Sequence, residues 1–329
     1  MSVMSDNVKQ VLVVGTGAIA GEYCKVLVDM GFIPDVVGRN QEKARKFSEN
    51  YHVPAYGGGI EKYLEKTSKT YDYAFVATDV VSLCSNTCNL LEYGIKNIFT
   101  EKPAGMNRME IKKICQIAEK RNANVFVAYN RRFFASTAKA MDIIREDGGV
   151  KSFNFEFTEW SHVIEPLSYS AELKEEWFLV NSTHVVDLAF FLGGEPRRLS
   201  SYVSGHLNWH KNGCVYAGAG VSRTNVLFSY QANWAAPGRW AVEILTSKHR
   251  LYFKPMEKLS IQELGSVAVN SVEIDDRLDQ EYKPGFYKEI ESFINEIDDG
   301  KKKTIQDQLR YMDYFEKIDG VEDTCVCSE

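Results

Sequence analysis

Short apolar runs alternate with helical patterns over the first 128 residues of the chain. Gln10–Val14 is a continuous strand-type run followed by glycines, and after it apolar residues recur at helical spacing. The same pattern predicts further strands at Asp35–Gly38, Tyr73–Ala77, Asn97–Thr100 and Val125–Ala128, with helices over residues 40–47, 60–64, 83–91 and 111–118. Near-continuous apolar strands that alternate with helices are typical of a parallel sheet covered on both faces, so we expect an α/β domain.

The pattern changes after about residue 150. Ser152–Glu159 alternates between apolar and polar positions, and one long helix is predicted from about Ala171 to Leu192. Strand-type runs separated by turn residues follow at Leu199–Gly205, Val221–Gln231, Trp240–Leu245 and Leu251–Phe253, and two helices near 286–297 and 306–318 end the chain. We therefore expect an α/β domain over residues 1–128 and an α+β domain with a largely antiparallel sheet over residues 129–329.

Composition and charge exclude several classes of protein. The chain has 329 residues, of which 44% are hydrophobic and 26% charged, enough apolar material for a full core. Its net charge of −6 argues against a nucleic-acid partner and against an anionic membrane surface. The N-terminal apolar run lacks a basic leader and contains two glycines, so we expect no signal peptide, and no run is long enough to span a membrane.

The seven cysteines do not form a disulfide framework, because their number is odd and their spacing is scattered. We therefore expect a reducing compartment and a cytoplasmic protein. The histidines and cysteines show no metal-ligand spacing, so we assign no metal.

A glycine-rich turn follows the first predicted strand. Gly15-Thr16-Gly17-Ala18-Ile19-Ala20 has the G-x-G-x-x-A spacing that lets a dinucleotide pyrophosphate approach the start of a helix. The pattern is weak alone and strong in the first strand–helix unit of an alternating chain. We expect Gly15, Gly17, Ala18 and Ile19 to bind the cofactor.

The end of the second strand bears on which dinucleotide is bound. NAD sites normally place an acidic residue there to bond the ribose 2′-hydroxyl, but here Gly38 takes that place and Arg39 and Asn40 follow it. Asp35 lies too early, at the start of the strand. Because a guanidinium can bind a 2′-phosphate, we expect Gly38, Arg39 and Asn40 to contact the cofactor and NADP to be preferred. In the alternative, Arg39 only stacks on adenine, and NAD would serve equally.

A further polar motif follows one of the later predicted strands. Glu101-Lys102-Pro103 comes after the Asn97–Thr100 strand, at the edge where open α/β sheets bind ligands. A lysine there could polarise a carbonyl or accept a proton, although position alone would favour an ordinary surface lysine.

Taken in order, the motifs resemble those of the Gfo/Idh/MocA family of dehydrogenases. The motifs are the glycine turn, Thr78, Glu101-Lys102-Pro103-Ala104, Asn130-Arg131-Arg132-Phe133 and His184-x-x-Asp187. The resemblance covers nearly the whole chain. It implies a Rossmann domain followed by an α+β domain whose open sheet forms homodimers or homotetramers. It also implies oxidation or reduction of a carbohydrate-like small molecule with NAD(H) or NADP(H).

Matched position by position, the resemblance implies that Lys102 and His184 are catalytic. It adds Thr78, Glu101 and Lys102 to the cofactor contacts, and Lys102, Tyr129, Arg131, His184 and Asp187 to the substrate contacts. Two positions depart from the family pattern: Val180 replaces a common Asp four residues before the histidine, and Asp79 replaces a common Pro after Thr78. The first departure argues against an inositol or simple polyol as the substrate.

The residues also support part of this interpretation directly. His184 and Asp187 lie three residues apart on a predicted helix, so they share a face, and Asp187 could orient the imidazole. A lone helical histidine would otherwise be a satisfied core residue. Of the two adjacent arginines, we expect one to meet a substrate anion, taken as Arg131, and the other to be structural. Trp160, His162 and Trp177 could form a sugar-binding wall or belong to the core.

Two other functions remain open beside a sugar-type dehydrogenase. One is a glycosidase or epimerase that recycles a tightly held cofactor, and the other is a cofactor-sensing regulator without activity. Retention of both Lys102 and His184 favours an enzyme, since a regulator needs neither.

Overall fold

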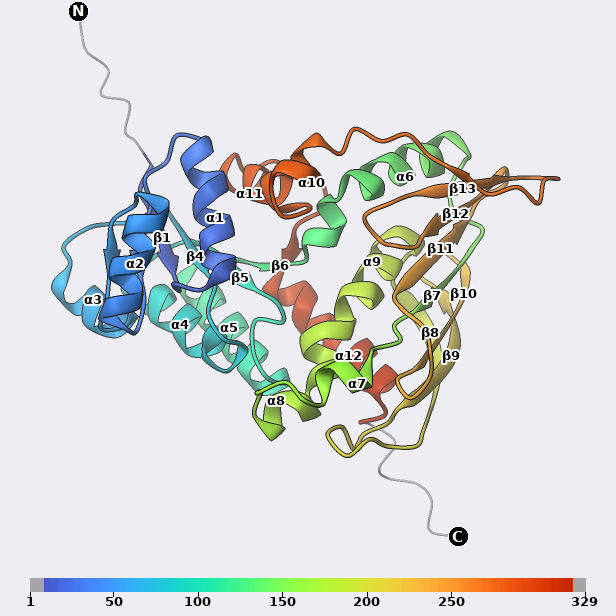
Figure 1. Ribbon diagram of the computed structural model, residues 1–329, viewed down its shortest axis with the longest axis horizontal. Helices are drawn as coiled ribbons and strands as arrows, with labels where there is room; N and C mark the ends of the chain where they lie inside the picture. Colours follow the sequence, from blue (N-terminus) through green and yellow to red (C-terminus); the bar gives the residue numbers. More distant parts are fainter. Residues whose placement is uncertain (1–8, 322–329) are drawn as a thin grey trace, which may run out of the picture. The chain divides into compact units, whose positions relative to one another are not determined.

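A computed structural model describes residues 9–321, which form two compact units (Figure 1). Unit 1 comprises residues 9–128 together with Phe286–Leu309, and unit 2 comprises Tyr129–Gly285 and residues 310–321. The sequence pattern predicted one boundary after residue 128. It did not predict that Phe286–Leu309 returns to unit 1, because this return depends on packing between distant parts of the chain.

Unit 1 is built on a seven-stranded sheet in the order β15-β6-β5-β4-β1-β2-β3. All neighbouring strands are parallel except β15 and β6. The strands β1 and β4 are buried at every position, which explains their unbroken apolar sequences. The bounds are β1 (Val11–Val14), β2 (Asp35–Val37), β3 (Ala55–Tyr56), β4 (Tyr73–Val76), β5 (Asn97–Glu101), β6 (Asn124–Ala128) and β15 (Lys303–Thr304).

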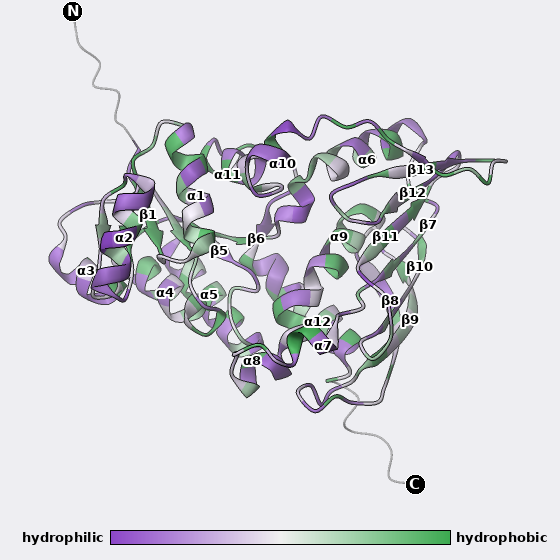
Figure 2. Ribbon diagram, in the orientation of Figure 1, coloured by the Kyte–Doolittle hydropathy of each residue, from purple (hydrophilic) through white to green (hydrophobic). Residues whose placement is uncertain are grey.

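Helices connect and cover these strands, as the alternating sequence pattern predicted. Their bounds are α1 (Ala18–Asp29), α2 (Gln41–Tyr51), α3 (Ile60–Lys66), α4 (Val80–Tyr93), α5 (Arg108–Arg121) and α11 (Phe286–Ile294). The rings of Tyr23 on α1 and Phe286 on α11 stack with centroids 5.1 Å apart, which packs the returning segment against the sheet's own helix. In Figure 2 the strand β1 is green, whereas the outer helices α2 and α3 are largely purple.

Unit 2 is built on an eight-stranded sheet in the order β14-β13-β12-β11-β7-β10-β9-β8. Only the pair β7 and β10 is parallel, so the prediction of a largely antiparallel sheet is confirmed. The strands are β7 (Ser152–Glu156), β8 (Pro196–Ser204), β9 (Val215–Ser222), β10 (Leu227–Asn233), β11 (Ala241–Leu245), β12 (His249–Phe253), β13 (Ser260–Glu263) and β14 (Asn270–Ser271).

One face of this sheet carries the aromatic core of unit 2. Phe153 stacks on Phe228 and Phe155 on Tyr230, with centroids 5.0 and 5.2 Å apart, and Phe190 packs edge-on against this layer. The remaining elements are η1 (Asn130–Phe133), α6 (Ala135–Glu146), α7 (Ser161–Ile164), α8 (Ala171–Glu175), η2 (Phe178–Ser182), α9 (Thr183–Gly193) and α10 (Arg277–Glu281). The helix α12 (Ile305–Asp319) begins in unit 1 and continues into unit 2.

Two predicted elements of unit 2 were wrong in detail. The run Val221–Gln231 is a hairpin of β9 and β10, turning through Asn225 at a φ of 63°. The strand β9 was missed because it is rich in glycine. A Cβ at Gly220 would collide with the ring of Phe228, so glycine is what lets that ring cross the neighbouring strand.

The second correction concerns the long helix predicted from Ala171 to Leu192. It is interrupted by η2, a π-helical turn over Phe178–Ser182. The side chains of Asn181 and Ser182 both donate to Glu159 Oε1, at 2.9 and 2.8 Å. Adjacent residues of a regular α-helix point about 100° apart, so the wider turn accompanies their convergence on one carboxylate. Across residues 9–321, no helix has both the length and the apolar character required to cross a membrane.

Candidate functional site

The glycine turn at the end of β1 leaves the first turn of α1 open. Gly15 has a φ of +126°, and a Cβ there would collide with the carbonyl oxygen of Ala77, so this position requires glycine. Gly17 and Ala18 are exposed, no side chain caps the helix, and a Cβ at Gly17 would meet nothing within 4 Å. The free N–H groups of this helix start are therefore accessible to a phosphate, and the turn fits a dinucleotide.

Gly38, Arg39 and Asn40 follow β2 at the same edge of the sheet. Asn40 caps α2, since its Oδ1 accepts a hydrogen bond of 2.9 Å from Lys43 N. The Arg39 side chain is 78% exposed, and its Nη2 donates to Asp79 Oδ2 at 2.7 Å. Asp79 is one of the two positions that depart from the family pattern. The sequence showed both residues but not that they form an ion pair.

Asp35, at the other end of β2, is committed to a separate cluster. Its Oδ2 accepts hydrogen bonds from Lys69 Nζ at 2.6 Å and from the Tyr71 hydroxyl at 2.7 Å, and its side chain is 6% exposed. This arrangement agrees with the expectation that Asp35 does not serve a ribose at the opposite end of the strand.

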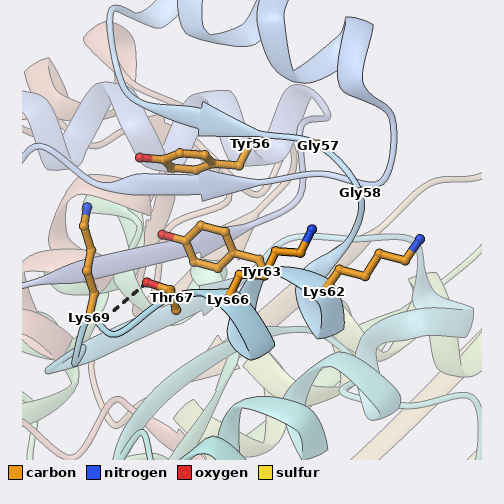
Figure 3. A pocket seen from close by; sticks show the side chains of 8 residues that line it. All are labelled: Tyr56, Gly57, Gly58, Lys62, Tyr63, Lys66, Thr67 and Lys69. Carbon is orange, nitrogen blue, oxygen red and sulfur yellow. Dashed lines mark hydrogen bonds between the residues drawn. The ribbon is translucent and has the colours of Figure 1, made fainter.

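A cavity of about 380 Å³ lies beside this cluster. In Figure 3 the rings of Tyr56 and Tyr63 lie one above the other, Lys69 stands on one side of them, and Lys62 and Lys66 extend on the other. Both tyrosine hydroxyls reach Asp35, at 3.3 and 3.4 Å, so these rings are held by the buried carboxylate. The sequence analysis did not identify this cavity.

Thr78, Glu101 and Lys102 follow β4 and β5, also at the carboxyl edge. Thr78 Oγ1 accepts hydrogen bonds from Ser82 Oγ at 3.0 Å and Asn86 Nδ2 at 3.1 Å. Glu101 ends β5 and accepts a hydrogen bond of 2.6 Å from the Tyr23 hydroxyl, which fixes the carboxylate next to the half-buried Lys102. Burial, and then the charge of Glu101, raise the pKa of Tyr23 well above its usual value.

Unit 1 thus brings every predicted cofactor residue to one edge of its sheet. The strands β5, β4, β1 and β2 are adjacent and parallel, so their carboxyl ends lie side by side. This is the edge at which open α/β sheets bind dinucleotides. Within residues 9–321, no group of three or more His, Cys, Asp or Glu side chains is placed to hold a metal ion.

His184 lies in the first turn of α9 in unit 2, directly after η2. It is 8% exposed, and its ring centroid lies 5.8 Å from that of Tyr129 and 6.2 Å from that of Trp240. Tyr129 is buried, and its hydroxyl donates to Thr183 Oγ1 at 3.3 Å, so the two predicted substrate residues Tyr129 and His184 are packed together. A π-helical turn next to such a residue is a frequent feature of functional sites.

Arg132 and Asp187 form a buried ion pair, and Asp187 lies three residues after His184 on α9. The Nε and Nη2 of Arg132 each donate to one oxygen of Asp187 at 2.7 Å, and the side chains are 7% and 1% exposed. Burial by itself lowers the pKa of Arg132, but the Asp187 carboxylate outweighs it and raises this pKa above its usual value. Arg132 is therefore the structural arginine of the pair. The role of Asp187 in orienting the imidazole stays a prediction.

Arg132→Met is expected to destabilise unit 2 by about 3–5 kcal/mol, because it removes the guanidinium from a buried carboxylate. Urea unfolding followed by circular dichroism measures this loss. Arg145→Met is the matched control, since Arg145 is 74% exposed and its pair with Asp142 lies on the surface of α6. That control should cost less than about 1 kcal/mol. Equal effects of the two substitutions would contradict a structural role for Arg132.

Three residues around Arg131 and Trp160 were missed by the sequence analysis as possible site residues. Arg239 and Trp240 follow the Pro237-Gly238 turn, and Glu159 follows β7. Arg239 Nη1 lies 3.4 Å from Glu159 Oε2, and its guanidinium lies 4.9 Å from the ring centroid of Trp160. An arginine–tryptophan pair after a turn is too common a pattern to identify a site without the neighbouring strands. Trp177 is 8% exposed and packs edge-on against Trp209, so it belongs to the core.

Comparisons with known proteins agree with this geometry. Residues 9–129 match the Gfo/Idh/MocA oxidoreductase family, described as an NAD-binding Rossmann fold. A trans-1,2-dihydrobenzene-1,2-diol dehydrogenase of Xenopus tropicalis is 29% identical over 128 residues, which are 37% of this chain and 37% of that relative. The sequence match thus spans little more than a third of the curated relative's length.

Solved structures share the fold over nearly the whole chain. An oxidoreductase from Agrobacterium radiobacter, in complex with NAD⁺, L-tartaric acid and magnesium, has a TM-score of 0.76 at 14% identity and covers 94% of both chains. A UDP-N-acetylglucosamine 3-dehydrogenase from Acidithiobacillus ferrooxidans has a TM-score of 0.70 at 14% identity and covers 94% of this chain and 96% of its own. Residues 9–129 therefore match the NAD-binding Rossmann fold of the Gfo/Idh/MocA oxidoreductases, and the solved structures share the fold of nearly the whole chain, including its sheet-rich second unit.

Proposed function

We propose that this protein is an NAD(P)-dependent dehydrogenase that transfers a hydride between nicotinamide and a CH–OH group of a sugar, polyol or nucleotide-sugar-type substrate. One observation carries the proposal: the open glycine turn and Lys102 lie at the same carboxyl edge of the unit 1 sheet. The similarity to a dihydrodiol dehydrogenase and to a nucleotide-sugar dehydrogenase supports the reaction type.

Each proposed role follows from the chemistry of the side chain. When bound, the nicotinamide would supply an acceptor for the hydride of the substrate C–H bond during oxidation. The Lys102 ammonium stabilises the oxygen as the hydroxyl becomes a carbonyl. His184 accepts the hydroxyl proton, and in the reverse direction it returns that proton to the new alcohol. Gly15, Gly17, Ala18 and Ile19 would hold the pyrophosphate, and Thr78 and Glu101 would border the nicotinamide half.

A panel of substrates tests this function and separates it from the alternatives. Sugars, polyols and nucleotide sugars are offered with NAD⁺ or NADP⁺, and the corresponding carbonyl compounds with NADH or NADPH, while absorbance at 340 nm is followed. Net change in absorbance with one class of substrate supports a dehydrogenase. Product formation without net change, together with cofactor that co-purifies and does not exchange, would indicate the recycling glycosidase or epimerase. Cofactor binding without turnover of any compound would indicate the regulator.

NADP(H) is expected to bind more tightly than NAD(H), because Arg39 can bind the 2′-phosphate. Asp79 competes with this phosphate for the Arg39 guanidinium. An exposed ion pair contributes at most about 1 kcal/mol, whereas a hydrogen bond to a charged phosphate contributes roughly 1.5–3 kcal/mol, so a 2′-phosphate displaces Asp79. Arg39→Ala should weaken NADPH binding about 10- to 100-fold and leave NADH binding nearly unchanged. Asp79→Asn should strengthen NADPH binding up to about fivefold.

Fluorescence titration of both reduced cofactors measures these affinities. The preference for NADPH over NADH should become smaller as the salt concentration rises. Arg45→Ala is the control, because Arg45 is an exposed arginine on α2 paired with Glu42 and Glu49. Gly38→Asp is a less direct test, since a Cβ at Gly38 would lie 2.6 Å from Thr16 Cγ2. Equal binding of NADH and NADPH would mean that Arg39 only stacks on adenine.

The open face of the unit 2 sheet is our proposed surface for a homodimer or homotetramer. Alternate residues of β9 and β10 are exposed on this face, and it includes Tyr202 and Leu227, which are 73% and 62% exposed. We also propose a cytoplasmic location, supported by five cysteines of the described residues that are buried as free thiols.

A further inference from the structure

Two arginines of unit 2 lie against one buried tryptophan beside His184. The guanidinium carbons of Arg131 and Arg239 are 4.8 and 4.7 Å from the ring centroid of Trp240. The ring of Trp240 lies 6.2 Å from that of His184. The cluster Arg131–Trp240–Arg239 therefore places two positive charges against the ring that neighbours His184, the proposed proton acceptor.

Arg131 has no carboxylate partner in the structure of residues 9–321. Its Nε is buried without a hydrogen bond, and its Nη1 has only a weak contact of 3.4 Å with Asn130 Oδ1. Burial lowers its pKa to about 10, while the more distant carboxylates Glu257 and Glu159 act on it in the opposite direction. A half-buried cation whose Nε is closed off from solvent without a partner is costly, so this guanidinium favours the arrival of an anion.

Arg239 is more exposed and already has a neighbour. Its side chain is 45% exposed, and its Nη1 lies 3.4 Å from Oε2 of the buried Glu159. Glu159 is held in place by Asn181 and Ser182, and its burial raises its pKa. When Glu159 is ionised, the two guanidiniums and this adjoining carboxylate leave one positive charge in the cluster. That excess fits a monoanion such as a carboxylate better than a dianionic phosphate.

We propose that the cluster Arg131–Trp240–Arg239 binds a carboxylate of the substrate, so that the enzyme acts on sugar acids or related hydroxy acids. A guanidinium matches a carboxylate with two parallel hydrogen bonds, and the ring of Trp160, which is 46% exposed, suits the carbon skeleton of a sugar. The proximity of Trp240 to His184 places the carboxylate a few bonds from the reacting hydroxyl. This inference rests on the proposed dehydrogenase function and names its substrate class.

Binding of matched acid and neutral compounds tests the proposal. Isothermal titration of the full chain compares D-glucuronate with D-glucose, D-galacturonate with D-galactose, and D-gluconate with D-glucitol, with and without NADP⁺. At least one acid should bind about 10- to 100-fold more tightly than its neutral partner. Arg131→Gln should abolish this preference by weakening acid binding alone, and Arg131→Lys should restore part of it. Arg145→Gln removes an equal charge from the exposed surface of α6 and should leave the preference intact.

Several outcomes would overturn the proposal. One is equal binding of every acid and its neutral partner by the wild type. Another is an equal loss of both by a folded Arg131→Gln variant, which would indicate a structural role. If that variant does not fold, Arg239→Gln replaces it. An unchanged preference of the Arg239→Gln variant for acids would contradict carboxylate binding by the cluster. Turnover of neutral compounds but not acids would leave the dehydrogenase function standing and reject this inference. Acid binding without turnover of any compound would instead support the carboxylate site and reject the dehydrogenase function.

Discussion

Lys102→Met is expected to lower turnover by about 10²- to 10⁴-fold while the fold and cofactor affinity are kept. Methionine has a similar length and no charge, so it fills the half-buried space after β5 without stabilising the oxygen of the substrate. Steady-state kinetics on the substrate found in the panel measures the loss. Titration of reduced cofactor by fluorescence should give a dissociation constant close to that of the wild type.

Lys112→Met is the matched control for this substitution. Lys112 is an exposed lysine on α5 in the same unit, and its replacement should leave turnover and cofactor binding unchanged. Near-normal turnover of Lys102→Met would show that the site has been assigned to the wrong lysine. A parallel loss of cofactor affinity would instead indicate a role in binding the nicotinamide half.

His184→Ala is expected to lower turnover by roughly 10²- to 10⁴-fold and to remove an acid limb from the pH–rate profile. During oxidation the neutral imidazole accepts the hydroxyl proton, so the wild-type rate should fall as the pH drops and His184 becomes protonated. The alanine variant lacks this group, and its remaining rate should not show the same limb. Rates of hydride transfer measured from about pH 5 to 9 test both parts, because histidine ordinarily titrates near pH 6.5.

His206→Ala provides the control for the histidine. His206 is an exposed histidine in the same unit, so its loss should change neither the rate nor the limb. If His184→Ala retained both the turnover and the acid limb, another group would have to move the proton. Tyr129 would be the next candidate, because its ring packs against His184.

The elements of unit 1 could be predicted because their sequence signals are local. A parallel strand buried on both faces must be apolar at consecutive positions, as Val11–Val14 and Tyr73–Val76 are. The glycine turn was equally readable, since the φ of Gly15 and its approach to Ala77 permit no side chain. In unit 2 the signals were weaker: the glycine-rich strand β9 has few side chains with which to show alternation.

The candidate site could be predicted only where a single residue or short motif carries the chemistry. Lys102 and His184 are proposed as site residues from the order of motifs along the chain. The pair of Arg39 with Asp79 and the pair of Arg132 with Asp187 join residues 40 and 55 positions apart. No local pattern reports such pairs, because each residue alone is compatible with many partners.

The sequence by itself determined the type of fold, the alternation of the main strands and helices up to residue 128, and the edge of the sheet where a dinucleotide would bind. These features follow from periodicity and backbone conformation, which depend on neighbours within a few residues. Only the tertiary structure decided which of the two adjacent arginines is neutralised, and that Arg131 and Arg239 share one tryptophan ring. Charge compensation and ring packing depend on which distant residues the folded chain brings within a few ångströms.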